Sequence, residues 1–157
     1  MKTIPEEARQ FFEEAGFGVI STADKEGRVH SSVKGMLHCD AEGVIYIADL
    51  YRQRTLRNLK ENPYVSIAVV DEHRFKGYVF EGSAQIIEGK EAVAACIDTW
   101  HEALARRMAT RVIRNVRGGT GRGDQPEARL PDPEYLIKVT VEKVIDLVPK
   151  EIRSSDT

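Results

Sequence analysis

The chain has 157 residues, of which 41% are hydrophobic and 31% charged, and its formal net charge is −2. This length suits one domain with a buried core. The near-neutral charge is not typical of a general nucleic-acid binder, which carries an excess of Lys and Arg. Residues 1–10 are polar and no apolar run approaches the roughly 20 residues of a membrane-spanning helix, so we expect a cytoplasmic protein without a membrane partner.

The Cys and His residues do not indicate a metal site. Cys39 and Cys96 stand far apart, and neither lies in a spacing typical of metal ligands. His38 and Cys39 are neighbours on an expected strand, which points their side chains to opposite faces. We therefore predict no bound metal and two buried, unreactive thiols.

The first half of the chain predicts one helix followed by a strand meander. Residues 5–15 place apolar side chains at helical spacing between Pro5 and Gly16, which favour a helix start and stop. Tight turns with Gly27 and Gly43 then separate three strands. These strands are expected at residues 17–22, 29–39 and 44–48.

The second half predicts two further helices and three further strands. A short helix at 52–61 ends at Asn62-Pro63, and the mostly apolar run 64–70 is typical of a strand buried on both faces. A strand is expected at 75–87, a helix at 90–108 and a closing strand at 135–147. The Arg- and Gly-rich segment 109–133 predicts a long flexible loop.

Together these elements predict a single domain over residues 1–157. Its class is α+β, mainly β: a six-stranded antiparallel barrel with flanking helices. Closing the sheet into a barrel removes the exposed edges that long strands otherwise present.

A phosphate site is indicated near residue 54. Arg54 and Thr55 lie near the start of a short helix, where free backbone N–H groups and the helix dipole favour an anion. A guanidinium adds a bidentate grip on phosphate oxygens, and Lys34 on a neighbouring strand supplies a further charge. The alternative is a solvated helix face, which is how we interpret Arg52, Arg57 and Lys60.

Three stretches in this order carry a family resemblance. TADKEGRVHSSVKG, DAEGVIYIAD and RTLRNLKENPYVSIAV resemble the FMN-binding split-barrel superfamily typified by pyridoxamine 5'-phosphate oxidase. The resemblance covers residues 11–87, and less surely the closing strand. It implies a six-stranded antiparallel split β-barrel, an FMN cofactor, and a homodimer with FMN at the subunit interface.

The resemblance also implies which residues contact FMN. In the family, the second strand runs along the isoalloxazine ring and ribityl chain, the end of the third strand contacts the ring, and a helix pair grips the phosphate. The matching positions are Ser32, Val33, Lys34 and Gly35; Ile47, Ala48 and Asp49; and Arg54 and Thr55. The oxidase itself tends to carry Arg-Lys where this chain has Arg54-Thr55, so Lys34 is expected to compensate for the missing charge.

Two further residues are assigned to the cofactor with an alternative beside each. Trp100 is either a core side chain of its helix or a ring packed on the flavin edge across the dimer. Lys76 is either an ordinary strand residue or a cation for the N1 and C2 carbonyl side of the flavin, supplied by the partner chain.

The resemblance implies an FMN-dependent oxidoreductase that acts on a small-molecule substrate with a nicotinamide donor. FMN carries the redox chemistry, so no catalytic residue is named. The Arg and His constellation of the vitamin-B6 oxidases is not matched in EYLIKVTVEKVIDLVPKEIR. Two alternatives stay open: a non-catalytic flavin- or haem-binding protein, and a deazaflavin-dependent reductase. The deazaflavin tail would need the basic residues Arg106, Arg107, Arg111, Arg114, Arg117 and Arg122.

Overall fold

The computed structural model describes residues 3–118 and 126–153. Its strands are β1 (Phe17–Ala23), β2 (Val29–Cys39), β3 (Val44–Asp49), β4 (Tyr64–Asp71), β5 (Lys76–Ile87) and β6 (Tyr135–Asp146). Its helices are α1 (Glu6–Ala15), α2 (Arg54–Glu61), α3 (Lys90–Gly118) and α4 (Lys150–Arg153), with a short 3-10 turn, η1 (Pro126–Arg129). The predicted strands and helices are therefore present, most within a residue or two of their expected bounds.

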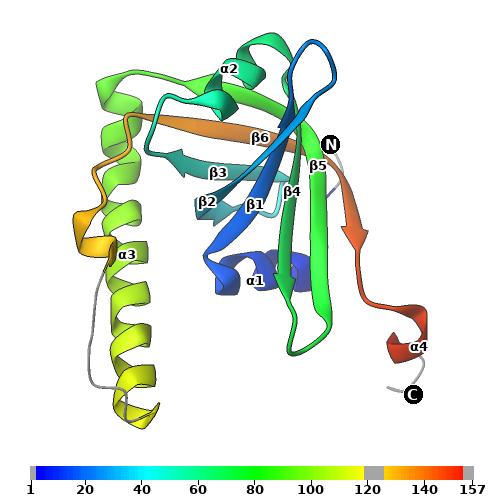
Figure 1. The fold of residues 1–157 in the computed structure, drawn as a ribbon, viewed down its shortest axis with the longest axis vertical. Helices are drawn as coiled ribbons and strands as arrows, with labels where there is room; N and C mark the ends of the chain where they lie inside the picture. Colours follow the sequence, from blue (N-terminus) through cyan, green and yellow to red (C-terminus); the bar gives the residue numbers. More distant parts are fainter. Residues whose placement is uncertain (1–2, 119–125, 154–157) are drawn as a thin grey trace.

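The strands close into an antiparallel barrel in the order β1-β2-β3-β6-β5-β4, with β4 pairing back onto β1. The last strand in the sequence enters between β3 and β5 (Figure 1). This arrangement confirms the predicted α+β split barrel.

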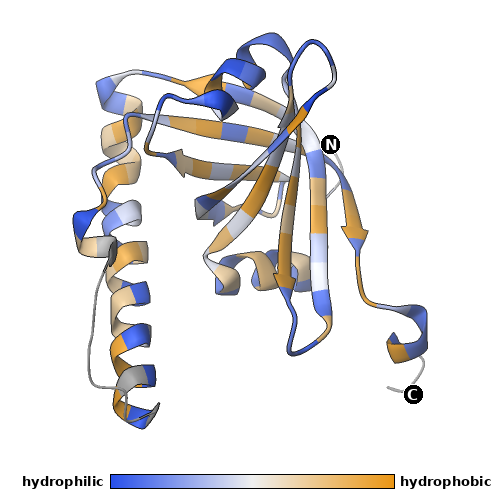
Figure 2. Ribbon diagram, viewed as in Figure 1, coloured by the Kyte–Doolittle hydropathy of each residue, from blue (hydrophilic) through white to orange (hydrophobic). Residues whose placement is uncertain are grey.

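Two helices close the ends of the barrel core. At one end, α1 buries Phe11 and Phe12, whose rings meet Tyr78 and Phe80 of β5 edge-on. At the other end, α2 buries Leu56 and Leu59 (Figure 1). Between the helices, the core is lined mainly by apolar side chains of β1, β3, β4, β5 and β6, and Figure 2 shows these strands with hydrophobic colours at many positions.

The strand β4 departs from the sequence expectation. It was predicted to be buried on both faces, but its side chains alternate between buried and more exposed positions. Val65, Ile67 and Val69 face the core, whereas Val70 lies on the outer surface with 63% of its area exposed. Within residues 3–118 and 126–153, the outer face at this position stays open to solvent.

The predicted loop at 109–133 is also corrected in part. The helix α3 continues to Gly118, so residues 109–118 are helical, and residues 119–125 lie outside the described part of the chain. The apolar residues Val112, Ile113 and Val116 continue the helical spacing within this extension. The Arg-rich composition obscured this pattern.

Candidate functional site: a cationic depression at the start of α2

The start of α2 is joined to β2 through two hydroxyl groups. The Oγ of Ser32 lies 3.1 Å from Oγ1 of Thr55, and Thr55 is buried. No side chain caps the helix, so its first backbone N–H groups have no side-chain acceptor from Gln53. The sequence placed these residues together, and the structure does so as well.

A depression of about 510 Å³ lies against this helix start. Its lining residues are His30, Arg52, Gln53, Arg54 and Arg57. Arg54 and Arg57 are exposed and one helical turn apart, which directs both guanidinium groups to one side of α2. In the described part of the chain, no carboxylate lies within ion-pair distance of either group. The depression therefore has the donor set and the charge of an anion site.

Arg52 occupies a different position in the same depression. Its guanidinium pairs with Glu88 at 2.6 Å and with Glu134 at 2.9 Å, and it lies 5.3 Å from the ring centre of Tyr135. These contacts join the start of α2 to the segments on either side of α3. Arg52 thus links α2 to the segments around α3, and its positive charge is largely balanced by the two glutamates.

Lys34 belongs to a buried cluster beside the depression. Its Nζ lies 2.5 Å from Oδ1 of Asp49, a carboxylate with only 1% of its area exposed, and the hydroxyl of Tyr135 donates to Oδ2 of the same carboxylate. Burial, together with this hydrogen bond, raises the pKa of Tyr135 well above its usual range. Because Asp49 neutralises Lys34, the expectation that Lys34 compensates for the charge missing at Thr55 is not supported.

The remaining expected contacts fall on two faces of the sheet. Side chains alternate along β2, so Ser32 and Lys34 share one face, whereas Val33 lies on the outer face with 65% of its area exposed. Ala48 pairs with Gly35 across β2 and β3, and the Ile47 side chain is buried in the core. Ile47 can therefore contact a ligand only through its backbone.

Trp100 packs on Gly35 within its own chain. A Cβ added at Gly35 would lie 2.7 Å from Cζ3 of Trp100, so only glycine allows α3 to approach β2 this closely. The indole ring is 2% exposed, and its Nε1 has no hydrogen-bond partner among the described residues. A buried donor without a partner at this point suits a ligand or water beside the ring.

Lys76 is not brought to this site within one chain. It pairs with Asp71 in the register of β4 and β5, and its Nζ lies 3.2 Å from Oε1 of Glu7 in α1. The α1 end of the barrel is opposite the α2 end (Figure 1). Its predicted role therefore depends on a second copy of the chain.

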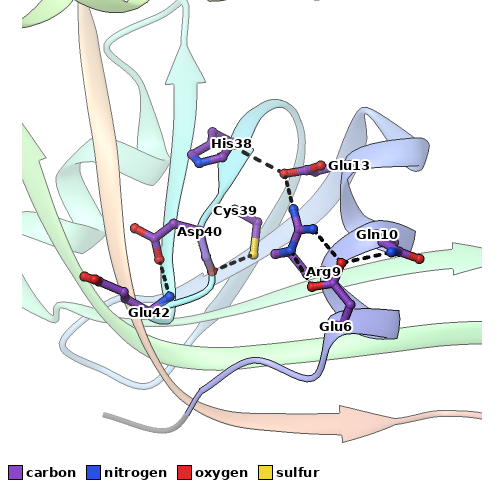
Figure 3. Close-up of polar contacts among 8 residues, drawn as sticks. All are labelled: Glu6, Arg9, Gln10, Glu13, His38, Cys39, Asp40 and Glu42. Atoms are coloured by element: carbon purple, nitrogen blue, oxygen red, sulfur yellow. Dashed lines mark hydrogen bonds and ion pairs between the residues drawn. The ribbon is translucent and has the colours of Figure 1, made fainter.

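A second group of polar residues joins α1 to the end of β2 (Figure 3). Arg9 bridges Glu6 at 2.6 Å and Glu13 at 3.1 Å, and His38 Nδ1 lies 3.4 Å from the same Glu13 oxygen. Cys39 is buried behind this group, and burial raises the pKa of its thiol to about 12. Cys96 is only partly buried, contrary to expectation. The group fastens α1 to the barrel and offers no reactive thiol.

Sequence reasoning missed three residues at the site. His30 and Arg57 line the depression, and Tyr135 completes the Asp49 cluster. The signals were present for two of them: His30 is two residues from Ser32 on a strand, and Arg57 is three residues from Arg54 on a helix. The 86-residue separation between Tyr135 and Asp49 left no local signal.

The closed six-stranded antiparallel barrel with flanking helices places the chain in the class of split-barrel proteins, and sequence comparison gives the family. The profile of the pyridoxamine 5'-phosphate oxidase family matches residues 4–147, so the chain belongs to that family. No curated protein sequence matches the chain significantly.

Solved structures share the fold at low sequence identity. HupZ of Group A Streptococcus is 19% identical over 92% of this chain and 94% of its own, with a TM-score of 0.67. General Stress Protein 26 from Bacillus anthracis is 17% identical over 92% and 94%, with a TM-score of 0.60. An F420 reductase is 16% identical over 90% and 98%, with a TM-score of 0.60. At these identities the likeness supports the fold alone.

Within residues 3–118 and 126–153, no helix has both the length and the apolar character needed to cross a bilayer. The same residues contain no group of three or more His, Cys, Asp or Glu side chains arranged to hold a metal ion.

Proposed function

We propose that this protein is an FMN-binding flavoprotein and an FMN-dependent oxidoreductase. The observation that carries the proposal is the depression at the start of α2, where Arg54 and Arg57 lie without carboxylate partners among the described residues. A phosphate dianion needs this combination of guanidinium groups and free helix N–H groups. Membership of the pyridoxamine 5'-phosphate oxidase family supports FMN as the source of that phosphate.

In this proposal the flavin ring lies beyond the phosphate along β2. Val33 supplies an exposed outer surface on which a flat ring can pack, and Trp100, which covers Gly35, borders it with an N–H that has no partner among the described residues. A bound flavin supplies hydride and electron transfer, which leaves the protein to bind, orient and shield it from water. No side chain of the described residues is required as an acid or base.

A second copy of the chain completes the proposed site. The outer faces of β1, β2 and β4 carry an exposed apolar patch of Phe17, Val19, Val33 and Val70. Val19 pairs with both Val33 and Ala68 in the sheet register, so these residues form one continuous surface. We propose a homodimer that buries this apolar patch and encloses the ring, because such patches on soluble proteins mark interaction sites.

The fold likeness to an F420 reductase keeps a deazaflavin cofactor as the second candidate. Its anionic tail was expected to need the basic residues from Arg106 onward. In the structure, Arg106 lies about 24 Å along α3 from Lys90, the residue that begins the helix near Glu88 and Arg52. The basic half of α3 is therefore remote from the α2 depression of the same chain, which favours FMN. Arg122 lies outside the described residues.

The test is FMN affinity in an Arg54→Ala variant, measured by fluorescence quenching of FMN. Loss of one charge-assisted contact should weaken binding by roughly tenfold to a hundredfold. Arg74→Ala is the matched control, because Arg74 is an exposed arginine in the β4–β5 turn at the opposite end of the barrel. Equal FMN affinity in wild type and Arg54→Ala would contradict the assignment.

The oxidoreductase part of the proposal has a separate test. The FMN-loaded protein should oxidise NADH or NADPH in steady state with a small-molecule acceptor. Retained FMN without turnover by any donor would instead identify a non-catalytic flavin carrier. A Soret band in the absorbance spectrum of the purified protein would identify a haem protein.

A further inference from the structure

The anion site at α2 has a second compartment. A hollow of about 290 Å³ adjoins the 510 Å³ depression, and the two share His30 and Arg54 among their lining residues. The second hollow is lined by Asp24, Arg28, Val29, His30, Arg54 and Asn58. It lies where the β1–β2 turn stands beside α2 (Figure 1). Two hollows thus lie on either side of one pair of cationic or protonatable side chains.

The charge of the second hollow also favours an anion. Asp24 is the only carboxylate in its lining, and Asp24 Oδ1 accepts backbone N–H bonds from Glu26 and Arg28 at 3.0 and 2.9 Å. Its other oxygen, Oδ2, lies 3.3 Å from Nε of Arg28, and the hydrogen bonds hold the pKa of Asp24 below its usual range. The aspartate is thus occupied by the turn, while Arg54 has no carboxylate partner in the described chain. Arg28 also lies 3.5 Å from Oε2 of Glu26, but this pair is on the surface and 75% of the Arg28 side chain is exposed, so little of its charge is held by it.

The two hollows meet near the start of β2. His30 of β2 lines both, Gln53 and Arg57 line only the first, and Arg28, in the turn just before β2, lines only the second. An anionic group bound near Arg28 would therefore adjoin one bound at Arg54 and Arg57, on the side away from Lys34 and the proposed ring position.

We propose that this hollow is a second phosphoryl subsite, so that the α2 site binds two neighbouring phosphoryl groups. The inference rests on the proposed function for the identity of the first group, the flavin phosphate. The second phosphoryl group belongs either to a flavin that carries a diphosphate or to a separate phosphorylated ligand such as a nicotinamide dinucleotide. Arg28 holds the second group, and Arg54 and His30 lie between the two.

The first test uses inorganic anions and needs no flavin. Isothermal titration calorimetry compares pyrophosphate with phosphate on wild type, Arg28→Gln and Arg74→Gln. We expect Arg28→Gln to weaken pyrophosphate binding by about tenfold or more and to leave phosphate binding within about twofold. Arg74→Gln removes the same charge from another aspartate-paired turn, so it should match wild type. Equal pyrophosphate affinity in all three proteins would overturn the proposal.

A second pair of variants avoids any weakening of the turn. Val29 lines the second hollow and is largely exposed, so its substitution should leave the fold intact. Val29→Glu should repel the second phosphoryl group and lower pyrophosphate affinity, whereas Val29→Gln, of similar size, should not. The same affinity in both variants would count against the subsite.

Flavin binding then separates the two sources of the second group. FAD affinity that depends on Arg28, with FMN affinity that does not, would place the second phosphate on the cofactor. Pyrophosphate binding to the FMN-loaded protein, dependent on Arg28, would place it on a separate ligand. Arg28-dependent pyrophosphate binding without any flavin binding would support the subsite while contradicting the proposed function. Flavin binding without preference for pyrophosphate over phosphate would support the proposed function and contradict the second subsite.

Discussion

Asp49 is a buried carboxylate that interacts with both an ammonium group and a tyrosine hydroxyl. Burying an ionised carboxylate is costly unless its oxygens are paired. Here one oxygen meets the ammonium of Lys34 and the other accepts from Tyr135, so both are satisfied. The cluster joins the middle of β2 to the end of β3 and the start of β6, beside the proposed ring position. It is therefore a structural support of the site, and its loss should be measurable without any ligand.

We predict that Tyr135→Phe lowers the free energy of unfolding by about 1.5–3 kcal/mol, because a buried carboxylate oxygen loses its donor. Since the folded-state pKa of Tyr135 is raised above that of an unfolded tyrosine, near 10, this stabilisation is present below pH 10 and is lost as the pH rises further. The difference between wild type and variant in urea denaturation should thus shrink at alkaline pH. Tyr46→Phe, a change on the neighbouring strand β3, is the control and should cost less than about 0.5 kcal/mol. A pH-independent difference would contradict the prediction.

At the scale of elements, α3 meets the barrel through a small contact. Trp100 covers Gly35, and an added Cβ at that glycine would also lie 3.6 Å from Nη2 of Arg107. Much of the helix beyond this point stands clear of the barrel (Figure 1). The contact between Gly35 and Trp100 is therefore one close approach that the structure shows between α3 and β2.

We predict that Gly35→Ala destabilises the protein by about 1–3 kcal/mol through this overlap and changes the fluorescence of Trp100. The double variant Gly35→Ala/Trp100→Leu should lose less stability than the sum of the two single changes, because Leu leaves room for the methyl group. Urea denaturation of the four proteins gives the coupling energy. Additive effects would show that the two residues do not press on each other.

Much of the fold could be predicted from local patterns, and the misses have physical causes. Strand alternation, Gly27 and Gly43 at the turns, and Asn62-Pro63 after α2 located nearly all elements. The extension of α3 to Gly118 was missed because its many arginines resemble a solvated loop, although Val112 and Val116 keep helical spacing. At the site too, some contacts could be predicted from local patterns and others could not. Ser32 and Thr55 were paired correctly, whereas the partner of Lys34 depends on strand order across the barrel, which no local pattern contains.

At the scale of the whole molecule, the two ends of the barrel are covered by helices, whereas part of its outer face is exposed. The α1 and α2 ends are closed by buried side chains, but the outer face of β1, β2 and β4 leaves the patch of Phe17, Val19, Val33 and Val70 in solvent. A two-fold symmetric dimer places the same patch on both sides of its interface. Both the proposed dimer and its proposed cofactor site therefore depend on this one apolar patch.

We predict that Val33→Glu weakens dimerisation by on the order of a hundredfold or more, because two like charges would meet in an apolar interface. Sedimentation velocity measures the association state, and FMN retention should fall in parallel. Val112→Glu changes an exposed valine on α3 and should leave both properties unchanged. A monomeric wild-type protein that retains FMN would contradict the dimer proposal.

The position of β6 has a consequence for how the chain is made. This strand pairs with β3 on one side and β5 on the other, yet it is the last strand to leave the ribosome. Until residues 135–146 emerge, β3 and β5 each present an unpaired edge. A chain that ends between β5 and β6 should thus form an incomplete sheet with two open edges, which favours aggregation.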